Sequence, residues 1–366
     1  MGLRDWFSRR SVWTRRLVLL LMVTMALGAI LWFTPTSYYI TAPGAAIDTS
    51  RLIAVPGGQT HSGQLYMLVV TTQPANLLLY LYAQLDHRAD LETPEQYLGG
   101  TQNYREYLEL TRRMMADSQQ AAKAIGLQLA GFGTGVRTVG AEITGLQVGS
   151  PNQSVIQAGD IVIEMNGQPI KAVAELRALL QNTAPGTDLP VRVKRKQAEV
   201  SFTAATIEHT DPARKGTAAL GVFVKDALEF DIPVDVQIKS GAITGPSAGM
   251  MFTLQIVDQL TPGGISGGRR YAGTGTIEPD GRVGSIGGAR QKVYTAEAAG
   301  AEVIFVPRAN YEVARQTARR ITVVPVDHVR DALDWLKLHR EQSGSGAGIY
   351  SLPFGYSRVA ASPHGW

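Results

Sequence analysis

The feature that most constrains the fold is an uninterrupted apolar run near the start of the chain. Residues 17–33 read LVLLLMVTMALGAILWF and contain no charged side chain. At about 1.5 Å per residue a helix of this length spans roughly 25 Å, close to the ~30 Å hydrocarbon core of a bilayer. The run therefore predicts a transmembrane anchor over 17–33, through which the chain contacts a lipid bilayer.

The basic residues of this region all precede the apolar run. Residues 1–16 form a basic leader with five arginines and one aspartate, a formal charge of +4 that equals the net charge of the whole chain. The positive-inside rule then predicts a cytoplasmic leader and an extracytoplasmic location for everything after about residue 35. Because the rest of the chain is formally neutral, no nucleic-acid partner is expected.

A cleaved signal peptide is the alternative to an anchor. The apolar run is long for that role and ends in Trp-Phe, and the small residues at 42–46 lie well beyond it. These features favour an uncleaved, single-pass anchor in the cell membrane. A buried helix of a soluble protein is a third interpretation, which the arginine leader disfavours.

Composition excludes several kinds of chemistry. The chain has no cysteine and six histidines, and it contains no H-E-x-x-H sequence. Disulfides, thiolate metal sites and a cysteine nucleophile are excluded, and we expect neither a metal nor another cofactor. The sequence also lacks G-x-x-x-x-G-K-[ST], so no Walker-type nucleotide site is expected.

The part after the anchor divides by pattern into three segments and a tail. Residues 37–125 predict apolar strands, including 77–85, followed by a helix over 104–125, all packing on the outer domains.

Residues 126–208 predict a β-rich unit with a strand pair at 135–146, a strand at 161–165 and a helix over 171–181. Its run AGDIVIEMNGQPI resembles the core of a bacterial PDZ domain, a module that binds extended peptides beside a helix. A purely structural β-domain is the alternative.

Residues 210–340 alternate strands and helices, and residues 341–366, rich in Gly, Ser and Pro, predict a disordered tail. The predicted elements include a strand at 234–238, an apolar helix at 247–260, a helix at 290–299 and strands at 303–306 and 321–326. The fold class expected for the whole chain is therefore α+β.

The sequence GPSAG at 245–249 carries the candidate nucleophile, Ser247. Proline favours the first turn of a helix, and a serine there lies among backbone N–H groups that can hold an oxyanion. A serine that merely caps the helix is the alternative.

From 247 to 330 the chain has nine arginines and one lysine, Lys292. Arginine cannot give up its proton, whereas a buried lysine can act as a base. A solvated surface lysine is the alternative.

Further motifs make the resemblance specific. GPSAG, TGTIEPDGRVGSIGGARQK and AGAEVIFVPRAN together resemble the proteolytic domain of Lon-family peptidases over about 130 residues. With the anchor and the PDZ-like unit, the architecture resembles the membrane-anchored PDZ-Lon proteases of bacteria. The resemblance implies that Ser247 is the nucleophile, Lys292 the dyad lysine and Thr274 the threonine that hydrogen-bonds it.

The implied function is an ATP-independent, membrane-anchored serine endopeptidase that cleaves extracytoplasmic proteins or peptides. The PDZ-like unit would either recruit the substrates or shield the active site, and the sequence does not choose between these roles. The resemblance also leaves open whether the chain acts as a monomer or a homo-oligomer. The alternative is a catalytically inactive PDZ/Lon-like scaffold tethered to the membrane, whose signature would be loss of the serine or the lysine. A trypsin-like envelope protease would need a His-Asp-Ser set and GNSGG, which the sequence lacks.

Overall fold

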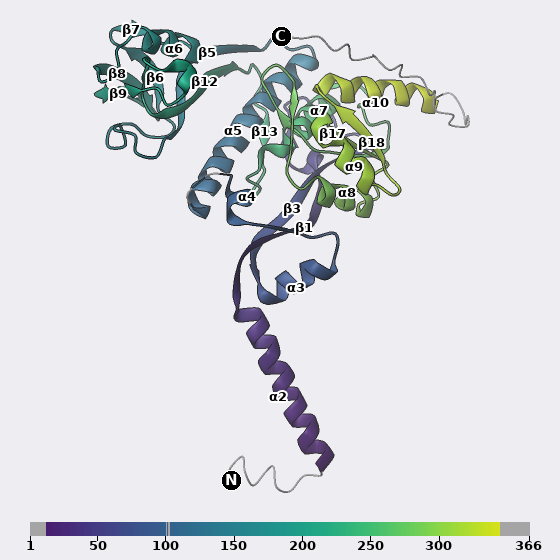
Figure 1. Cartoon of the computed structure of the whole chain (residues 1–366). Coiled ribbons are helices and arrows are strands. Elements are labelled where there is room, and N and C mark those ends of the chain that lie inside the picture. The colour runs from purple at the N-terminus through teal and green to yellow at the C-terminus, as the bar shows by residue number, and fades with distance from the viewer. Residues whose placement is uncertain (1–11, 100, 102, 345–366) are drawn as a thin grey trace, which may run out of the picture.

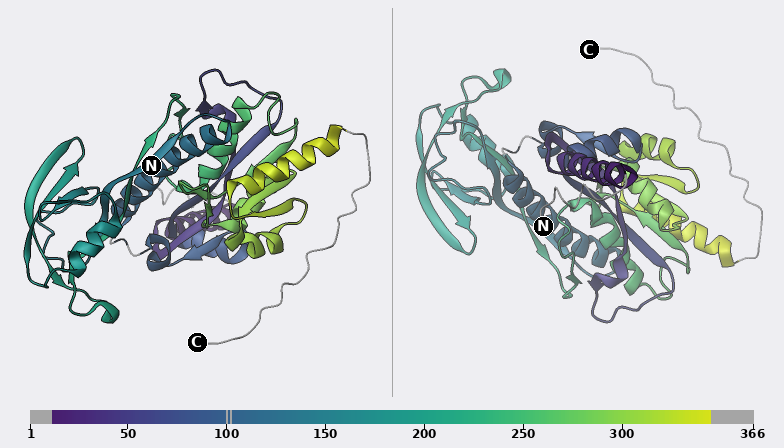
Figure 2. Two further views of the ribbon diagram at one scale, coloured as in Figure 1. Left: turned by 90° about the horizontal axis from the view of Figure 1, so that it is seen from above. Right: turned by 90° about the horizontal axis from the view of Figure 1, so that it is seen from below.

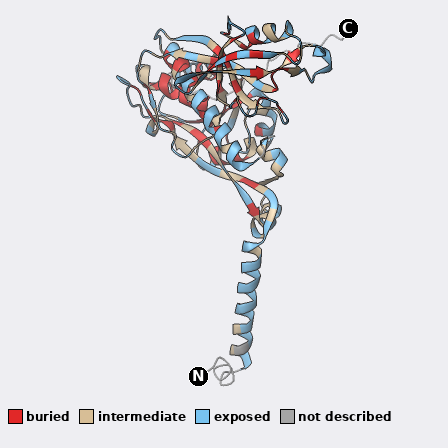
Figure 3. Ribbon diagram, turned by 90° about the vertical axis from the view of Figure 1, so that its left-hand side faces the viewer, coloured by how far each residue is buried: buried red, intermediate tan, exposed pale blue. Residues whose placement is uncertain are grey.

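A computed structural model describes residues 12–99, 101 and 103–344. The chain enters through helix α2 (Val12–Phe33), which begins five residues before the predicted apolar run. In the described part of the chain this is the one helix that is long and apolar enough to cross a membrane. Figure 3 shows it standing away from the folded body, with most of its residues exposed. Residues 1–11 of the predicted leader lie outside the described residues.

A six-stranded mixed sheet forms the main body. Its strands run in the order β18-β17-β14-β3-β1-β4. Strands β3, β14, β17 and β18 pair in parallel, and β1 pairs antiparallel with β3 and β4. Their bounds are β1 (Pro35–Asp48), β3 (Gln64–Asn76), β4 (Asp90–Glu92), β14 (Arg270–Gly273), β17 (Val303–Pro307) and β18 (Thr322–Val326). Three strands from the segment 37–125 therefore complete the sheet of the C-terminal unit instead of packing on its outside.

Helices cover both faces of this sheet because the central strands are apolar on both sides. Leu65, Tyr271 and Phe305 point to one face and join a core with α5, α7 and α10, whereas Ala272 and Ile304 point to the other face and meet α8 and α9. The helices are α5 (Tyr104–Leu129), α7 (Gly249–Leu260), α8 (Ala289–Ala298), α9 (Tyr311–Thr317) and α10 (Val329–Gly344). Figures 1 and 2 show these layers from three directions.

A second sheet forms the PDZ-like unit, with strand order β12-β5-β6-β8-β9 and β7 paired to β6. Its core includes Ile143, Val162 and Val193, with Leu176 contributed by helix α6. The elements are β5 (Gly135–Leu146), β6 (Ile161–Met165), β7 (Gln168–Pro169), α6 (Val173–Gln181), β8 (Asp188–Arg195), β9 (Ala198–Ala205) and β12 (Val222–Asp231). Strand β12 comes from the segment assigned to the C-terminal unit, so the sheet crosses the predicted division at 208–210. The long strands β5 and β12 join this unit to the main body (Figure 1).

The remaining described elements are short. They are η1 (Thr49–Arg51), β2 (Ile53–Ala54), α3 (Leu77–Leu85), α4 (Pro94–Leu98), β10 (Ile207–Glu208), η2 (Pro212–Arg214), β11 (Ala218–Ala219), β13 (Gln237–Ile238), η3 (Pro246–Ala248), β15 (Thr276–Ile277), β16 (Val283–Gly284) and η4 (Arg308–Asn310). Three two-stranded pairs form among them, β10 with β11, β13 with β2, and β15 with β16.

The α+β class is confirmed, and the structure corrects four local predictions. Residues 77–85 form helix α3, because Asn76 caps it by accepting a hydrogen bond from the backbone of Leu79. An apolar run of this length fits a strand or a helix equally well. Residues 135–146 form one long strand instead of a pair, and the strand at 234–238 is limited to its last two residues. Helix α10 continues through Gly344, so the predicted tail is helical at its start, and residues 345–366 lie outside the described part.

The contact between α5 and α7 can be tested at Gly126. A Cβ added there would lie 2.8 Å from Cβ of the buried Ile256. We expect Gly126→Ala to lower the free energy of unfolding by about 1–3 kcal/mol through overpacking, although alanine is the better helix former by roughly 1 kcal/mol. Chemical denaturation followed by circular dichroism measures the change. Adding Ile256→Ala removes Cγ2 and Cδ1 of that side chain, which would lie 2.9 and 3.2 Å from the added carbon, and so relieves part of the overlap. The double variant should therefore lose less stability than the two single losses together. Strictly additive losses would contradict this contact.

Candidate active site

Ser247 lies in the short helix η3, directly before helix α7. Pro246 occupies the first position of η3, and its fixed backbone angle suits the entry into a helix. Helix α7 begins at Gly249 and receives no hydrogen bond from a side chain at its cap. The Ser247 hydroxyl therefore does not serve as the cap of α7, and it is available for another partner.

That partner is Lys292, the fourth residue of α8. Its Nζ lies 2.9 Å from Oγ of Ser247 and 3.0 Å from Oγ1 of Thr274. The structure thus brings together the three residues that the sequence singled out, although they lie on separate elements. Lys292 is only 3 % exposed, so the alternative of a solvated surface lysine is excluded.

Burial changes the protonation of this lysine. Removing the ammonium from water disfavours its charged form, and this desolvation lowers the pKa of Lys292 to about 7. Near neutral pH a large fraction of the amine is therefore unprotonated and carries a free lone pair. The sequence predicts this shift only on the condition that Lys292 is buried, and the structure meets that condition.

Thr274 connects the lysine to the loop that carries Ser247. Its hydroxyl donates to the carbonyl oxygen of Ser247 at 3.2 Å, and the backbone N–H of Gly275 donates to the same oxygen at 2.8 Å. Since the Thr274 proton is used in this way, its oxygen can accept an N–H from Lys292. The threonine is 1 % exposed, so this orientation is protected from competing water.

Ser118 is a residue of the site that sequence reasoning missed. It lies on α5, and its hydroxyl donates to the carbonyl oxygen of Pro246 at 3.0 Å across 128 residues of sequence. A Cβ added at Gly249 would lie 2.2 Å from the Ser118 hydroxyl oxygen, so α5 is packed directly on the loop. The preceding residue, Asp117, pairs with Lys225 of strand β12. No local motif surrounds Ser118, and only the fold reveals the contact.

A cleft of about 500 Å³ opens beside the residue that precedes Ser247. Its walls come from α5, β12, η3 and the β15–β16 pair, and they include Ser118, Lys225, Pro246 and Thr276. The cleft therefore lies between the main body and the strand that belongs to the PDZ-like sheet. Its size and its mixed apolar and polar walls suit an extended peptide segment.

A second groove of about 250 Å³ lies on the PDZ-like unit, between α6 and the first residues of β12. Leu176 and Leu180 line one side, and Leu220 and Val222 line the other, with Gly221 at φ +67° between them. β12 is an edge strand of its sheet in the described part of the chain. An edge strand beside a helix is the arrangement by which PDZ domains add a peptide as a further strand. The sequence alone did not locate this groove.

In the described residues no group of three or more His, Cys, Asp or Glu side chains could hold a metal ion. The groups gathered at the site are a hydroxyl, an amine of lowered pKa and backbone N–H groups.

Comparisons with known proteins identify two domain families in this chain. Residues 217–338 match the family described as Lon protease (S16) C-terminal proteolytic domain, and residues 124–206 match the PDZ domain family. The chain therefore contains a PDZ domain followed by a Lon-type proteolytic domain, which confirms both resemblances noted in the sequence. A Lon-type proteolytic domain supports a serine peptidase.

Individual relatives cover the C-terminal part of the chain. Lon protease 2 of Herpetosiphon aurantiacus is 34% identical over 125 residues, which is 33% of this chain and 15% of that protein. Lon protease 1 of Myxococcus xanthus is 35% identical over 126 residues, again 33% of this chain and 15% of the relative. The chain thus spans only about 15% of the length of these curated relatives. Among solved structures, the PDZ domain of the SdrC-like protein from Listeria monocytogenes aligns with 24% of this chain and 87% of that chain, at 19% identity and a TM-score of 0.22.

The contact of Ser118 with the Ser247 loop predicts a specific kinetic defect. We expect Ser118→Ala to slow the reaction of Ser247 with a fluorophosphonate reagent by about 5–10-fold, because one lost hydrogen bond is worth roughly 1 kcal/mol or slightly more. Thr111→Val is the matched control, since Thr111 is a buried hydroxyl on the same helix that bonds only within it, to Leu108. If both variants slowed the reagent equally, the effect would belong to the helix as a whole and not to Ser118.

Proposed function

We propose that this chain is an ATP-independent serine endopeptidase, anchored to a membrane, that uses Ser247 as nucleophile and Lys292 as general base. The observation that carries the proposal is the 2.9 Å separation between Lys292 Nζ and Ser247 Oγ, at a lysine whose pKa burial lowers to about 7. A base within hydrogen-bonding distance of a hydroxyl, with a pKa close to the working pH, is what nucleophilic catalysis requires.

In the proposed acylation step, the lone pair of Lys292 Nζ takes the proton of the Ser247 hydroxyl as Oγ attacks a peptide carbonyl carbon. The carbonyl oxygen becomes an oxyanion, for which the backbone N–H groups of Ser247 and Ala248 in η3 are the proposed donors, since those of Gly249 and Met250 already donate to the carbonyls of Pro246 and Gly275. The tetrahedral intermediate then expels the amine of the downstream peptide. That amine takes the proton from the Lys292 ammonium, and an ester to Ser247 remains.

In the proposed deacylation step, Lys292 again acts first as a base and then as an acid, and Ser247 is the leaving group. The neutral amine of Lys292 takes a proton from water, and the hydroxide formed attacks the ester carbon. The Ser247 oxygen leaves and regains its proton from the lysine, and the upstream peptide is released as a carboxylic acid. Thr274 keeps the amine directed at Ser247 Oγ through both steps, because its oxygen lies 3.0 Å from Nζ.

Extended, unstructured protein segments are the proposed substrates. The 500 Å³ cleft beside Pro246 would receive the segment to be cut, and the groove between α6 and β12 would hold another part of the same polypeptide. The 366-residue sequence contains no Walker-type motif, so the proposal includes no ATP-driven unfolding. Proteins without stable structure, or with exposed loops, should therefore be cut in preference to folded ones.

The proposed location is the extracytoplasmic side of a membrane, with α2 as a single-pass anchor. The support is the apolar 22-residue helix and the cluster of arginines that precedes residue 17. Such a helix would hold the peptidase close to the bilayer, where membrane proteins with exposed loops and newly exported polypeptides are the proposed targets.

Loss of either dyad residue should remove proteolysis. We expect Ser247→Ala, Lys292→Ala and Lys292→Arg each to lower the rate of casein cleavage without ATP by about 10³-fold or more. The arginine variant keeps a positive charge but cannot act as a base. Ser201→Ala and Lys337→Ala serve as controls, because they replace an exposed serine and an exposed lysine that are not part of the dyad. If the wild-type chain bound unfolded peptides but released no fragments, the inactive-scaffold alternative would replace this proposal.

The pH dependence follows from the pKa of the lysine. Because burial lowers the pKa of Lys292 from 10.5 to about 7, the active unprotonated amine is lost as pH falls through 7. We expect kcat/KM to fall about tenfold per unit below pH 6 and to level off above pH 8. A fluorogenic peptide assay gives the profile, with intrinsic fluorescence recorded at each pH to verify that the chain stays folded. A profile that kept rising to pH 10 would mean that the amine titrates like a free lysine, and the assignment of the base would be wrong.

A further inference from the structure

Helix α3 presents an apolar stripe to the outside of the folded body. Leu78, Leu81, Tyr82 and Leu85 are 39%, 44%, 45% and 87% exposed, respectively. Their spacing of three and four residues places them on one face of the helix. On the other side of the helix, Leu79 and Ala83 pack against the small core around Ile40. Helix α3 is therefore apolar on both faces, although only one face is needed for the packing of the protein itself.

The position of α3 indicates what covers the outer face. The backbone N–H of Leu77 donates to the carbonyl oxygen of Thr34, the residue after the last one of α2, at 2.9 Å. Figure 1 shows α3 at the base of the body, beside the end of α2. Trp32 and Tyr38 lie at the same junction and are 57% and 37% exposed. Tryptophan and tyrosine are typical of the boundary between lipid and water. The stripe is therefore continuous with the surface at which an anchoring α2 would leave the bilayer.

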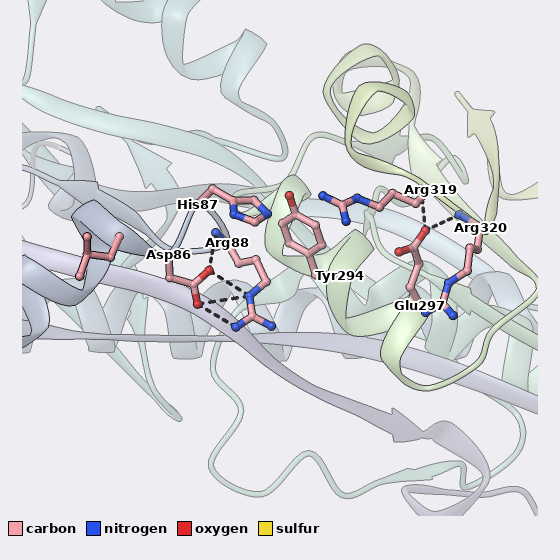
Figure 4. Close-up of a pocket in the computed structure, with 8 residues that line it drawn as sticks. Asp86, His87, Arg88, Tyr294, Glu297, Arg319 and Arg320 are labelled. Carbon is pink, nitrogen blue, oxygen red and sulfur yellow. Dashed lines mark hydrogen bonds and ion pairs between the residues drawn. The ribbon is translucent and has the colours of Figure 1, made fainter.

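A basic pocket of about 780 Å³ adjoins the C-terminal end of α3, and Figure 4 shows the residues that line it. Glu297 accepts backbone hydrogen bonds from Arg319 and Arg320 at 2.7 Å each, which fixes the loop that carries these two exposed arginines. Arg88 lies across the pocket, where it pairs with Asp86. Guanidinium groups match the geometry of phosphate oxygens, and anionic headgroups attract basic residues at the membrane surface.

We propose that α3 is an interfacial helix that lies on the bilayer, with its outer stripe in the boundary between headgroups and acyl chains. Arg319 and Arg320 then contact the phosphates of anionic lipids. The inference rests on the proposed anchoring by α2 and is independent of the proposed peptidase chemistry. Since α3 follows directly on β3, whose Met67 pairs with Gly273 next to Thr274, this second contact fixes the height and tilt of the active site above the membrane. Segments of substrate close to the bilayer would then be favoured.

The absence of cysteine allows a direct test on the full-length chain. Leu81→Cys and Leu85→Cys are each labelled with an environment-sensitive nitrobenzoxadiazole dye. The labelled chains are reconstituted into vesicles of phosphatidylcholine and phosphatidylglycerol that contain nitroxide-bearing lipids. Leu20→Cys, in α2 and 62% exposed, reports the anchor, and Val148→Cys, 93% exposed in the turn after β5, is the control in water. We expect the two α3 labels to be quenched several-fold more than the label at 148. Nitroxides near the headgroup should quench them most, whereas nitroxides deep in the chains should quench the label at 20 most.

Each outcome decides between the alternatives. If the label at 20 is quenched and the labels at 81 and 85 behave like that at 148, α3 does not touch lipid and the inference is overturned while the anchor stands. If the label at 20 is also unquenched, anchoring fails and the inference fails with it, and casein cleavage by the same sample reports separately on the peptidase proposal. If quenching at 81 and 85 falls as protein density in the vesicles rises, a second copy of the chain covers the stripe and lipid does not.

The proposed contact of Arg319 and Arg320 with lipid phosphates is tested separately. Replacing both residues, Arg319→Gln with Arg320→Gln, should lower quenching of the label at 85 at least twofold in vesicles with phosphatidylglycerol. The same replacement should leave quenching unchanged in vesicles of phosphatidylcholine alone. An equal loss in both kinds of vesicle would overturn the contact with anionic lipids in particular, and no loss in either would overturn any contact of these arginines with the headgroups.

Discussion

The site depends on one interaction, the approach of the buried Lys292 amine to the hydroxyls of Ser247 and Thr274 at 2.9 and 3.0 Å. A charged ammonium at this depth would cost several kcal/mol of desolvation, so the fold shifts the balance toward the neutral amine.

The lowered pKa of Lys292 also affects the stability of the folded state. The pKa of the lysine falls from 10.5 in the unfolded chain to about 7 in the folded one, so the unfolded chain binds more protons between these values. The stability of the folded state therefore rises with pH across that window, and the cost of burying the charge is greatest below it.

Several segments far apart in sequence are needed to bury that amine and hold the serine. Strands β1 and β3 complete the sheet next to β14, and α5 covers α7 and bonds to the carbonyl of Pro246. These segments lie outside residues 217–338, which match the Lon proteolytic domain family. The structural unit around the site is therefore larger than the matched region. Strand β12 adds a connection of another kind, because its first residues line the PDZ groove and its later ones line the cleft beside Pro246.

Most elements with strong local signals were predictable. The strand at 161–165 has the predicted bounds, and the helices α5, α6 and α8 begin or end within a few residues of the predictions. The predictions failed where a local sequence pattern fits both a helix and a strand, or where the place of a strand depends on the strand with which it pairs. Residues 77–85 are nearly all apolar and fit either periodicity, and the helix is stabilised by the cap at Asn76 and by the packing of Leu79 and Ala83. The pairing of β12 with β5 was invisible because a strand's partner is set by the long-range packing of the sheet, not by its own residues.

The sequence by itself determined the chemical groups and their order along the chain: a serine in GPSAG, one lysine among nine arginines, a threonine between them, and an apolar run after a basic leader. These follow from residue identity, because the hydroxyl, the amine and the hydrocarbon surface are fixed by composition. Only the tertiary structure decided that Lys292 is 3 % exposed, that Ser118 supports the loop, and that α3 turns an apolar face outward. Burial and proximity between distant residues arise from packing, and a desolvated amine acquires its lowered pKa only when the rest of the fold excludes water from it.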